Sequence, residues 1–131
     1  MADNDQLQVE LVAADRTVWS GQATMVIART TEGDLGVLRN HAPVLSLLVP
    51  GVVEISPVDG DRLVAAVDGG FISVAANRVS VLSEHAVLSH EIDVEQARTE
   101  LESAESEGDS DEAAERAKRA EARIRAAEKA S

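Results

Sequence analysis

The sequence predicts an α+β protein in two parts, an N-terminal antiparallel β-sandwich of about ten strands and a C-terminal antiparallel hairpin of two helices. Three observations support this prediction. Apolar residues alternate with a period of two as far as about Leu88, turn-forming residues recur at short intervals, and beyond Ile92 the apolar spacing changes to three and four. We therefore expect a sandwich domain over residues 1–90 and a mobile helical element over residues 91–131.

Short alternating segments rich in β-branched residues carry the prediction of strands. Leu7, Val9 and Leu11 alternate with polar residues, and so do Val79 and Val81. Turn signals at this spacing are typical of an all-β sandwich or flattened barrel. They are Asp15-Arg16, Glu32-Gly33-Asp34, Pro50-Gly51, Asp59-Gly60-Asp61, Gly69-Gly70 and Asn77-Arg78.

The helical hairpin is predicted from its start and stop signals. Asp93 followed by Gln96 resembles a capping box at the start of the first helix. Gly108 breaks the pattern, and Asp109 and Ser110 are good candidates to begin the second helix. The apolar stripes of the two helices are Val94, Ala97, Leu101 and Ala104, then Ala113, Ala117, Ala120, Ile124 and Ala127.

These stripes consist mainly of alanine, so the hairpin has little apolar surface to bury. A buried leucine or isoleucine contributes about 1.5–3 kcal/mol, and alanine much less. We expect charged pairs at i, i+4 to add about 0.2–0.5 kcal/mol each. The hairpin is thus predicted to be the least stable part of the molecule, as switching elements are. The expected pairs are Glu112 with Arg116, Glu115 with Arg119, and Glu121 with Arg125.

The composition excludes several classes of function. A net charge of -12 disfavours binding to nucleic acid or anionic lipid, and the absence of cysteine excludes disulfides and thiolate metal sites. The acidic residues 1–5 are typical of neither a signal nor a transit peptide, and the apolar run 44–49 is too short to cross a bilayer. His41, His85 and His90 lack metal-ligand spacing. We expect no catalytic residue, no metal and no cofactor.

From composition and periodicity alone, two kinds of binding protein remain open. One is a small-ligand-binding β-sandwich module, and the other is a free nucleotide sensor. Modules of the first kind usually present aromatic platforms, whereas Trp19 and Phe71 are the only aromatic residues of this chain. A nucleotide titration of the isolated protein would separate a sensor from other functions.

A family resemblance goes further than composition. Residues 32–45, EGDLGVLRNHAPVL, closely resemble the signature of the epsilon subunit of the bacterial rotary, proton-translocating ATP synthase. Asn40 stands where that family usually has glycine, a mild departure because asparagine also tolerates left-handed backbone. The resemblance extends over about residues 6–98. Further matches lie at Val18-Trp19-Ser20-Gly21, Pro50-Gly51, Gly69-Gly70-Phe71, Val79-Ser80-Val81-Leu82 and Ile92-Asp93.

The resemblance implies a non-catalytic central-stalk subunit on the cytoplasmic side of the bacterial plasma membrane, attached peripherally through the complex. Its implied partners are the gamma subunit, the polar loops of the membrane c-ring and, when the hairpin is extended, the catalytic alpha and beta subunits. Such a subunit couples proton-driven rotation to ATP synthesis and restrains ATP hydrolysis through its hairpin. The residues implied to bind the gamma subunit or the c-ring are Glu32, Gly33, Asp34, His41, Ala42 and Pro43.

Some members of the resembled family also bind ATP on the folded hairpin. Their motif is matched here by Ile92, Asp93 and Ala97, and the arginine pair of the second helix by Arg119 and Arg123. Two positions depart from it. Gln96 stands where the motif has arginine, and Val87 where binders have an acidic residue. Charged hydrogen bonds of this kind contribute about 1.5–3 kcal/mol each, so we expect weak or no nucleotide binding.

Overall fold

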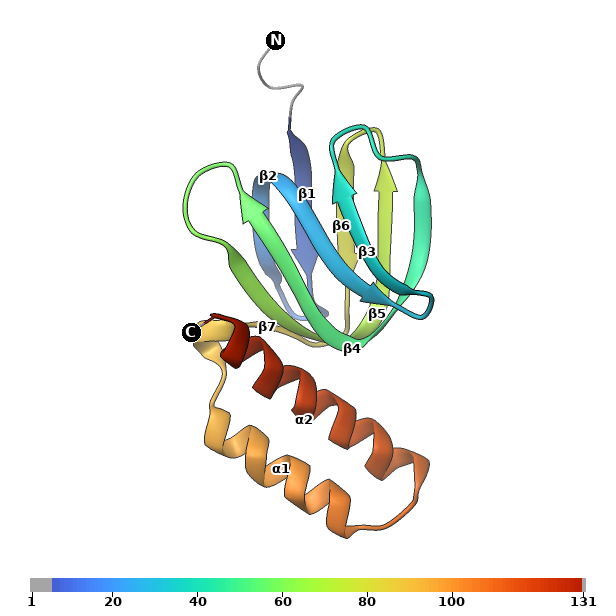
Figure 1. The fold of residues 1–131 in the computed structure, drawn as a ribbon, viewed down its shortest axis with the longest axis vertical. Coiled ribbons are helices and arrows are strands. Elements are labelled where there is room, and N and C mark those ends of the chain that lie inside the picture. Colours follow the sequence, from blue (N-terminus) through green and yellow to red (C-terminus); the bar gives the residue numbers. More distant parts are fainter. Residues whose placement is uncertain (1–5, 131) are drawn as a thin grey trace.

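A computed structural model describes residues 6–130 and has the predicted fold class, a β-sandwich followed by two antiparallel helices (Figure 1). The acidic start of the chain, residues 1–5, lies outside the described residues. The elements are β1 (Leu7–Val12), β2 (Thr17–Thr30), β3 (Gly33–Leu38), β4 (Val44–Pro57), β5 (Leu63–Ala75), β6 (Arg78–Leu82), β7 (Ala86–Leu88), the 3-10 turn η2 (Ser89–Glu91), α1 (Val94–Ser106) and α2 (Asp111–Ala130).

The sheet closes on itself. Its strand order is β1-β6-β5-β4-β2-β3, β7 pairs with β5, and β1 also pairs with β2. Between residues 6 and 130 there are seven strands, not about ten, because β2, β4 and β5 are long enough to belong to both layers. The two predicted turns Pro50-Gly51 and Gly69-Gly70 are therefore wrong. They lie inside β4 and β5, facing each other across the ladder where both strands curve (Figure 1).

This bend depends on glycine at one position. Gly70 has a φ of 109°, a conformation that L side chains rarely adopt. A side chain at Gly70 would also collide with the carbonyl oxygen of Leu82 on β6. Curvature and close strand approach thus explain the Gly69-Gly70 pair, which the sequence pattern alone indicated as a turn.

The sandwich core has the two-residue period predicted from the sequence. Leu7, Val9 and Leu11 are buried, and the residues between them lie nearer the surface. Trp19 packs against this core from a partly buried position. Each of the larger side chains contributes about 1.5–3 kcal/mol on burial, so we expect this domain to be the more stable part of the molecule. Its other fully buried large residues are Val26, Val37, Val53, Ile55, Val67, Ile72, Val74, Val79 and Val81.

The predicted helix boundaries are confirmed. Asp93 caps α1, since its side chain accepts a hydrogen bond from the N–H of Gln96 at 3.1 Å. Gly108, with a φ of 92°, lies between the helices. The Ser110 hydroxyl accepts from the N–H of Ala113 at 3.0 Å at the start of α2. These side chains satisfy backbone donors that a helix start leaves without partners.

The second helix has two apolar stripes where the sequence analysis identified one. Ala113 and Ala120 belong to the predicted stripe and are buried. Ala122 and Ala126 form another stripe, which packs on Val64 and other residues of β4, β5 and the following segment. As a result, α2 lies against the sandwich and α1 lies outside α2 (Figure 1).

Candidate functional site

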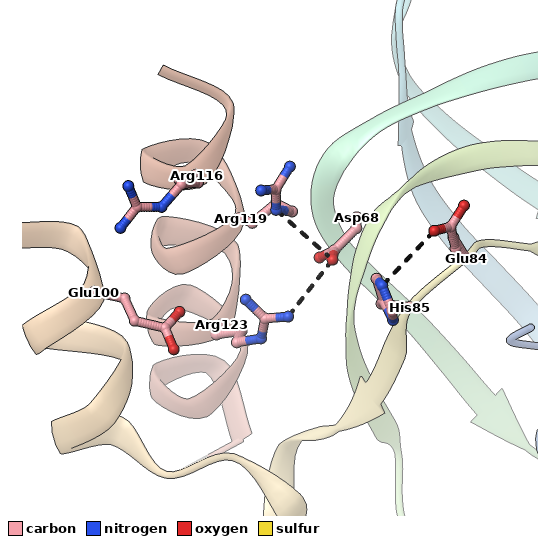
Figure 2. A pocket seen from close by; sticks show the side chains of 7 residues that line it. All are labelled: Asp68, Glu84, His85, Glu100, Arg116, Arg119 and Arg123. Carbon is pink, nitrogen blue, oxygen red and sulfur yellow. Dashed lines mark ion pairs between the residues drawn. The ribbon is translucent and has the colours of Figure 1, made fainter. Parts of the chain in front are cut away.

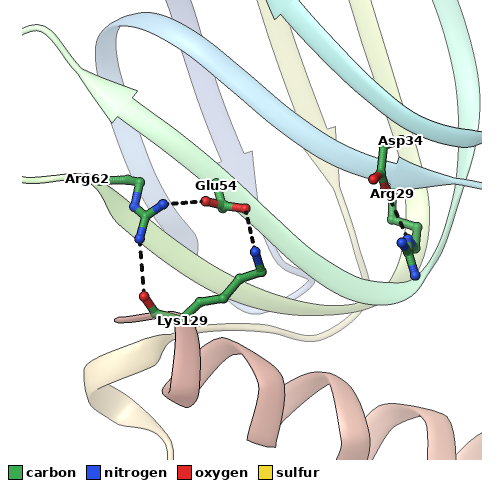
Figure 3. Close-up of polar contacts among 5 residues, drawn as sticks. All are labelled: Arg29, Asp34, Glu54, Arg62 and Lys129. Carbon is green, nitrogen blue, oxygen red and sulfur yellow. Dashed lines mark hydrogen bonds and ion pairs between the residues drawn. The ribbon is translucent and has the colours of Figure 1, made fainter. Parts of the chain in front are cut away.

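The acidic turn between β2 and β3 is exposed and is closed by hydrogen bonds. The Thr30 hydroxyl, itself buried, donates to the carbonyl of Gly33 at 2.8 Å and accepts from the N–H of Glu32 at 3.1 Å. Asp34 forms an ion pair with Arg29 across the β2–β3 ladder, with 3.0 Å between Nε and Oδ1 (Figure 3). Glu32 therefore provides the charge of this turn that forms no ion pair within residues 6–130, whereas Asp34 is paired with Arg29 at an exposed position.

The predicted residues of the following loop lie at the other end of β3. His41 donates through Nδ1 to the carbonyl of Ala42 at 2.7 Å. The backbone N–H of His41 donates to the carbonyl of Leu38. Asn40 has a φ of 67°, as expected for a residue that replaces glycine, and its N–H donates to the side chain of Asn77 at 2.6 Å. The structure therefore places Glu32, Gly33 and Asp34 at one end of β3, and His41, Ala42 and Pro43 at the other (Figure 1).

A row of exposed apolar side chains, Leu45, Leu47, Phe71 and Leu82, connects these two ends. Their exposed fractions are 71%, 64%, 40% and 36%. Leu47 pairs with Phe71, and Phe71 with Leu82, so the side chains project from the same face of β4, β5 and β6. The row also borders the acidic turn, because the N–H of Thr31 donates to the carbonyl of Leu47 at 3.0 Å.

The apolar row was missed in the sequence analysis, although one signal pointed to it. In residues 44–49 only Ser46 is polar, so both faces of this strand are apolar. A strand of this kind is usually covered on both sides. In a sandwich with one solvated face, such a run marks the outer side as a candidate interaction surface.

A second candidate site lies between α2 and the sandwich, where Asp68 of β5 faces two arginines (Figure 2). The Asp68 carboxylate lies 3.5 Å from Arg123 Nη2 and 3.9 Å from Arg119 Nε, and its side chain is 9% exposed. Burial raises the pKa of Asp68 above its ordinary value, while Arg123 and Arg119 act against this rise. The open pocket here measures about 770 Å³ and is lined by Asp68, Glu84, His85, Glu100, Arg116, Arg119 and Arg123.

The remaining predicted nucleotide-binding residues line an adjoining groove of about 270 Å³. Ile92, Asp93 and Ala97 come together there with Arg123, while Arg119 lies in the larger pocket. The two departures from the motif, Gln96 and Val87, also face this groove. Arg123 is the one cation among its lining residues, against three carboxylates. This charge balance is unfavourable for a polyanion. The three carboxylates are Glu91, Asp93 and Glu100.

The arginines of α2 do not form the predicted i, i+4 pairs with Glu112 and Glu115. Arg116 instead donates to Glu107 near the end of α1, and Arg119 faces Asp68. Both arginines lie on the side of α2 toward the other elements, where carboxylates of those elements approach them. Tertiary placement thus overrides the local pairing suggested by spacing along the helix.

The C-terminal end of α2 is tied to the sandwich by a separate polar cluster (Figure 3). Glu54 accepts a hydrogen bond from Arg62 Nη1 at 2.7 Å, and its other oxygen lies 3.4 Å from the Lys129 ammonium. Arg62 also donates to the carbonyl oxygen of Lys129 at 3.1 Å. A cation at this place satisfies a carbonyl in the last turn of the helix and complements the negative end of its dipole.

The connection between sandwich and hairpin is fixed at Glu91. Arg16, from the loop before β2, donates to both carboxylate oxygens of Glu91, at 2.7 and 3.0 Å. Glu91 also accepts from the N–H of Leu88 at 2.9 Å. The hydrogen bonds from Arg16 and Leu88 lower the pKa of Glu91 to about 2. The turn η2 is thereby attached to the sandwich, so a movement of the hairpin would have to pivot beyond Glu91.

Two kinds of site are not found among residues 6–130. This part of the chain contains no cluster of three or more histidines or carboxylates arranged to hold a metal ion. It also contains no helix with the length and hydropathy needed to span a membrane.

Comparisons of the sequence with known proteins agree with the family resemblance of residues 32–45. Residues 6–89 match the family model described as the β-sandwich domain of the ATP synthase delta/epsilon chain. The ATP synthase epsilon chain of Streptomyces coelicolor is 55% identical over 122 residues, covering 93% of this chain and 95% of that one. The epsilon chain of Streptomyces avermitilis is 58% identical over 99 residues, covering 76% of this chain and 80% of its own length.

Solved structures show the same similarity. A chain of the Euglena gracilis mitochondrial ATP synthase, from a structure of its OSCP, F1 and c-ring, has a TM-score of 0.78 and 25% identity. The match covers 96% of this chain and 81% of that one. A chain of the central stalk and c-ring of the Tetrahymena thermophila enzyme has a TM-score of 0.56 at 19% identity over 95% of both chains, which indicates a shared fold.

Proposed function

Because this chain belongs to the ATP synthase delta/epsilon family, we propose that it is a non-catalytic central-stalk subunit that couples c-ring rotation to ATP synthesis. In this role it would lie on the cytoplasmic side of the bacterial plasma membrane, attached through the complex. The observation that carries the proposal is the exposed apolar row of β4, β5 and β6.

The apolar row is the surface we assign to the gamma subunit. Four large apolar side chains in one row are an unfavourable surface for a protein that stays alone in water. Covering them would contribute up to about 1.5–3 kcal/mol for each side chain that becomes fully buried. His41, Ala42 and Pro43 continue the surface beyond Leu45, because they directly precede β4. The proposed gamma-binding surface therefore runs along the first half of β4.

The acidic turn is the surface we assign to the polar loops of the c-ring. It adjoins the apolar row at Leu47, so a single docking face could meet both partners. Glu32 is the residue we expect to meet a cationic or amide side chain of those loops. Asp34 is assigned a supporting role, since its ion pair with Arg29 braces the turn.

The hairpin is the part we assign to regulation. Folded against the sandwich it would permit rotation, and extended toward the alpha and beta subunits it would restrain ATP hydrolysis. Its shallow apolar contact with the sandwich, made on the helix side by Ala122 and Ala126, is compatible with such a movement. We do not assign it a nucleotide-sensing role, because Arg119 and Arg123 already face Asp68 and Gln96 supplies no charge.

The experiment is co-purification of this chain with the gamma subunit after substitution in the apolar row. Leu47→Glu should abolish or strongly reduce binding, because a carboxylate would be buried at the centre of the interface. Val58→Glu is the matched control, since Val58 is also an exposed apolar residue but lies outside the row. Retention of full gamma binding by Leu47→Glu, with the fold intact, would contradict the assignment.

A charge reversal tests the second contact. Glu32→Lys should weaken the coupling of proton flow to ATP synthesis in the assembled complex while binding to the gamma subunit persists. Proton pumping equal to that of the unsubstituted complex would show that Glu32 does not contact the c-ring.

A further inference from the structure

We propose that Asn77 is a positioning residue for the gamma-binding surface, because its side chain fixes the loop 39–43, which contains His41, Ala42 and Pro43. This role rests on the function proposed above, which places that loop at one end of the surface assigned to the gamma subunit. Asn77 itself belongs to the turn between β5 and β6, at the same end of the sandwich as the loop (Figure 1).

Two asparagines join the loop to this turn. The backbone N–H of Asn40 donates to Asn77 Oδ1 at 2.6 Å, and Asn77 Nδ2 donates to Asn40 Oδ1 at 3.3 Å. The shorter bond needs only the side chain of Asn77, since a backbone N–H is present at position 40 in nearly any residue. The contact therefore depends mainly on Asn77.

The loop needs such a bond because it leaves a strand that is paired on one side. Among residues 6–130, β3 pairs with β2 alone, and the chain then crosses to β4, which pairs with β5 from Val44 onward. Inside the loop, His41 bonds to the carbonyls of Leu38 and Ala42. These bonds join close neighbours, so they shape the loop without placing it on the sandwich. The bond to Asn77 joins residues 37 positions apart.

Asn77 is in turn held by the sandwich. Its carbonyl accepts from the N–H of Gln8 at 2.8 Å, at the start of β1. The β5–β6 ladder closes directly at the turn, where Ala75 pairs with Arg78. Ala76 and Asn77 have φ values of 51° and 62°, a left-handed conformation that asparagine tolerates better than most residues. The side chain of Asn77 thus projects from an anchored turn, and the loop is placed relative to it.

A fixed loop favours binding because the partner does not have to order it. Ala42 and Pro43 are exposed, and the loop leads directly into the apolar row at Leu45. Without the bond to Asn77, fewer molecules would present the loop in its docked arrangement, and association would be slower. A residue that touched the partner directly would instead act mainly on dissociation. This difference separates a positioning residue from a contact residue.

Amide exchange of the full chain, followed residue by residue with NMR, tests the bond. Asn77→Gly removes the side chain and keeps a residue that adopts left-handed backbone readily. Exchange at the Asn40 amide should be about fivefold faster, the factor expected for one ordinary hydrogen bond. Exchange in the ladder of β5 and β6 should be unchanged. Ala76→Gly is the matched control, because it adds the same flexibility to the same turn and removes only a methyl group. An equal rise in both variants, or none in Asn77→Gly, would overturn the proposal.

Binding kinetics with the purified gamma subunit test the positioning role. Asn77→Gly should lower the association rate constant by up to about fivefold and leave the dissociation rate constant unchanged. Asn77→Asp should restore the association rate, since its carboxylate accepts from the Asn40 N–H. A change confined to dissociation would make Asn77 a contact residue and contradict this role. Unchanged binding in Asn77→Gly, or no restoration in Asn77→Asp, would also contradict it.

The positioning role and the proposed function can fail separately. If Leu47→Glu abolishes gamma binding and Asn77→Gly leaves it unchanged, the gamma-binding surface stands and the positioning role is wrong. If Asn77→Gly slows association and Leu47→Glu has no effect, the loop meets the gamma subunit and the apolar row is wrongly assigned. If neither substitution alters binding, both assignments are wrong.

Discussion

In the sandwich the largest buried side chains are leucines, isoleucines and valines, whereas each buried side chain of α1 and α2 is an alanine, within residues 6–130. The sandwich buries its branched residues between two layers of a closed sheet. The hairpin brings helix backbones close together, but it removes much less apolar surface from water.

This difference shows how two parts of one chain are stabilised by different means. Alanine, which has the highest helix propensity, recurs along α2 and favours its helical conformation. The attachment of the hairpin to the sandwich includes charged groups beside the small apolar contact, at Asp68 in the middle of the contact and at Glu54 near its C-terminal end. Contacts between exposed or half-exposed charges weaken as salt is added, because dissolved ions screen them.

The largest expected effect comes from replacing one isoleucine by alanine in each of the two parts. Ile72→Ala should lower the free energy of unfolding of the whole protein by about 2–5 kcal/mol, because Ile72 is fully buried in the sandwich and leaves a cavity. Ile124→Ala, on the half-buried stripe of α2, should mainly increase local opening of the hairpin. Chemical denaturation measures the first effect and hydrogen exchange the second. Equal losses of global stability would show that the two regions unfold as one unit.

The next effect concerns the contact between α2 and the sandwich. Ala126→Glu should release the hairpin, because Ala126 is fully buried against β4 and β5 and has no room for a charged side chain. We expect a cost to docking of about 1–3 kcal/mol with the sandwich intact. The measurement is amide exchange over residues 93–130. Ala114→Glu, on the exposed side of the same helix, is the control, and similar exchange in both variants would contradict the assigned face.

A smaller effect is expected at the connection between the two parts. Glu91 has its pKa lowered to about 2 from 4.5, so its interaction with Arg16 stabilises the folded state above pH 4.5. That contribution is lost as the pH falls from about 4.5 toward 2. Glu91→Gln should therefore be less stable than the unsubstituted protein near neutral pH, and the difference should shrink in acid. Thermal unfolding as a function of pH provides the test, and a constant difference would exclude the ion pair as its cause.

The smallest expected effect is that of added nucleotide on the hairpin. Mg-ATP should bind with a dissociation constant of about 1 mM or weaker, since Gln96 and Val87 supply no charge and the arginines already face the Asp68 carboxylate. Calorimetric titration of the isolated chain measures this. Gln96→Arg should raise the affinity only modestly. A micromolar constant that disappears in Arg119→Ala with Arg123→Ala would contradict this prediction.

The family resemblance carried by residues 32–45 is confirmed by the family model and by relatives at 55–58% identity. The motif was informative because the turn at Gly33 and the loop at Asn40 both impose left-handed backbone, which few residue types tolerate. The strand count was predicted less well. Pro50-Gly51 and Gly69-Gly70 are locally typical of turns, and only the pairing of β4 with β5 shows that they lie at a bend within continuous strands.

The placement of the predicted site residues shows the same limit. Spacing along the chain correctly indicated that Arg119 and Arg123 share a helical face, because a helix has a fixed period. It could not indicate that this face meets Asp68, which lies about fifty residues earlier, and it assigned Arg116 and Arg119 to partners on their own helix. The Ala122 and Ala126 stripe was missed because alanine is compatible with both buried and exposed positions.

The sequence by itself determined the fold class, the point where strands give way to helices and the caps that begin both helices, because each depends on residues close together in the chain. Only the tertiary structure decided which apolar residues remain exposed at Leu45 and Leu47, and which carboxylate meets the arginines of α2. These features depend on strand register and on the docking of distant segments, where the energy of one arrangement over another comes from contacts that local periodicity does not encode.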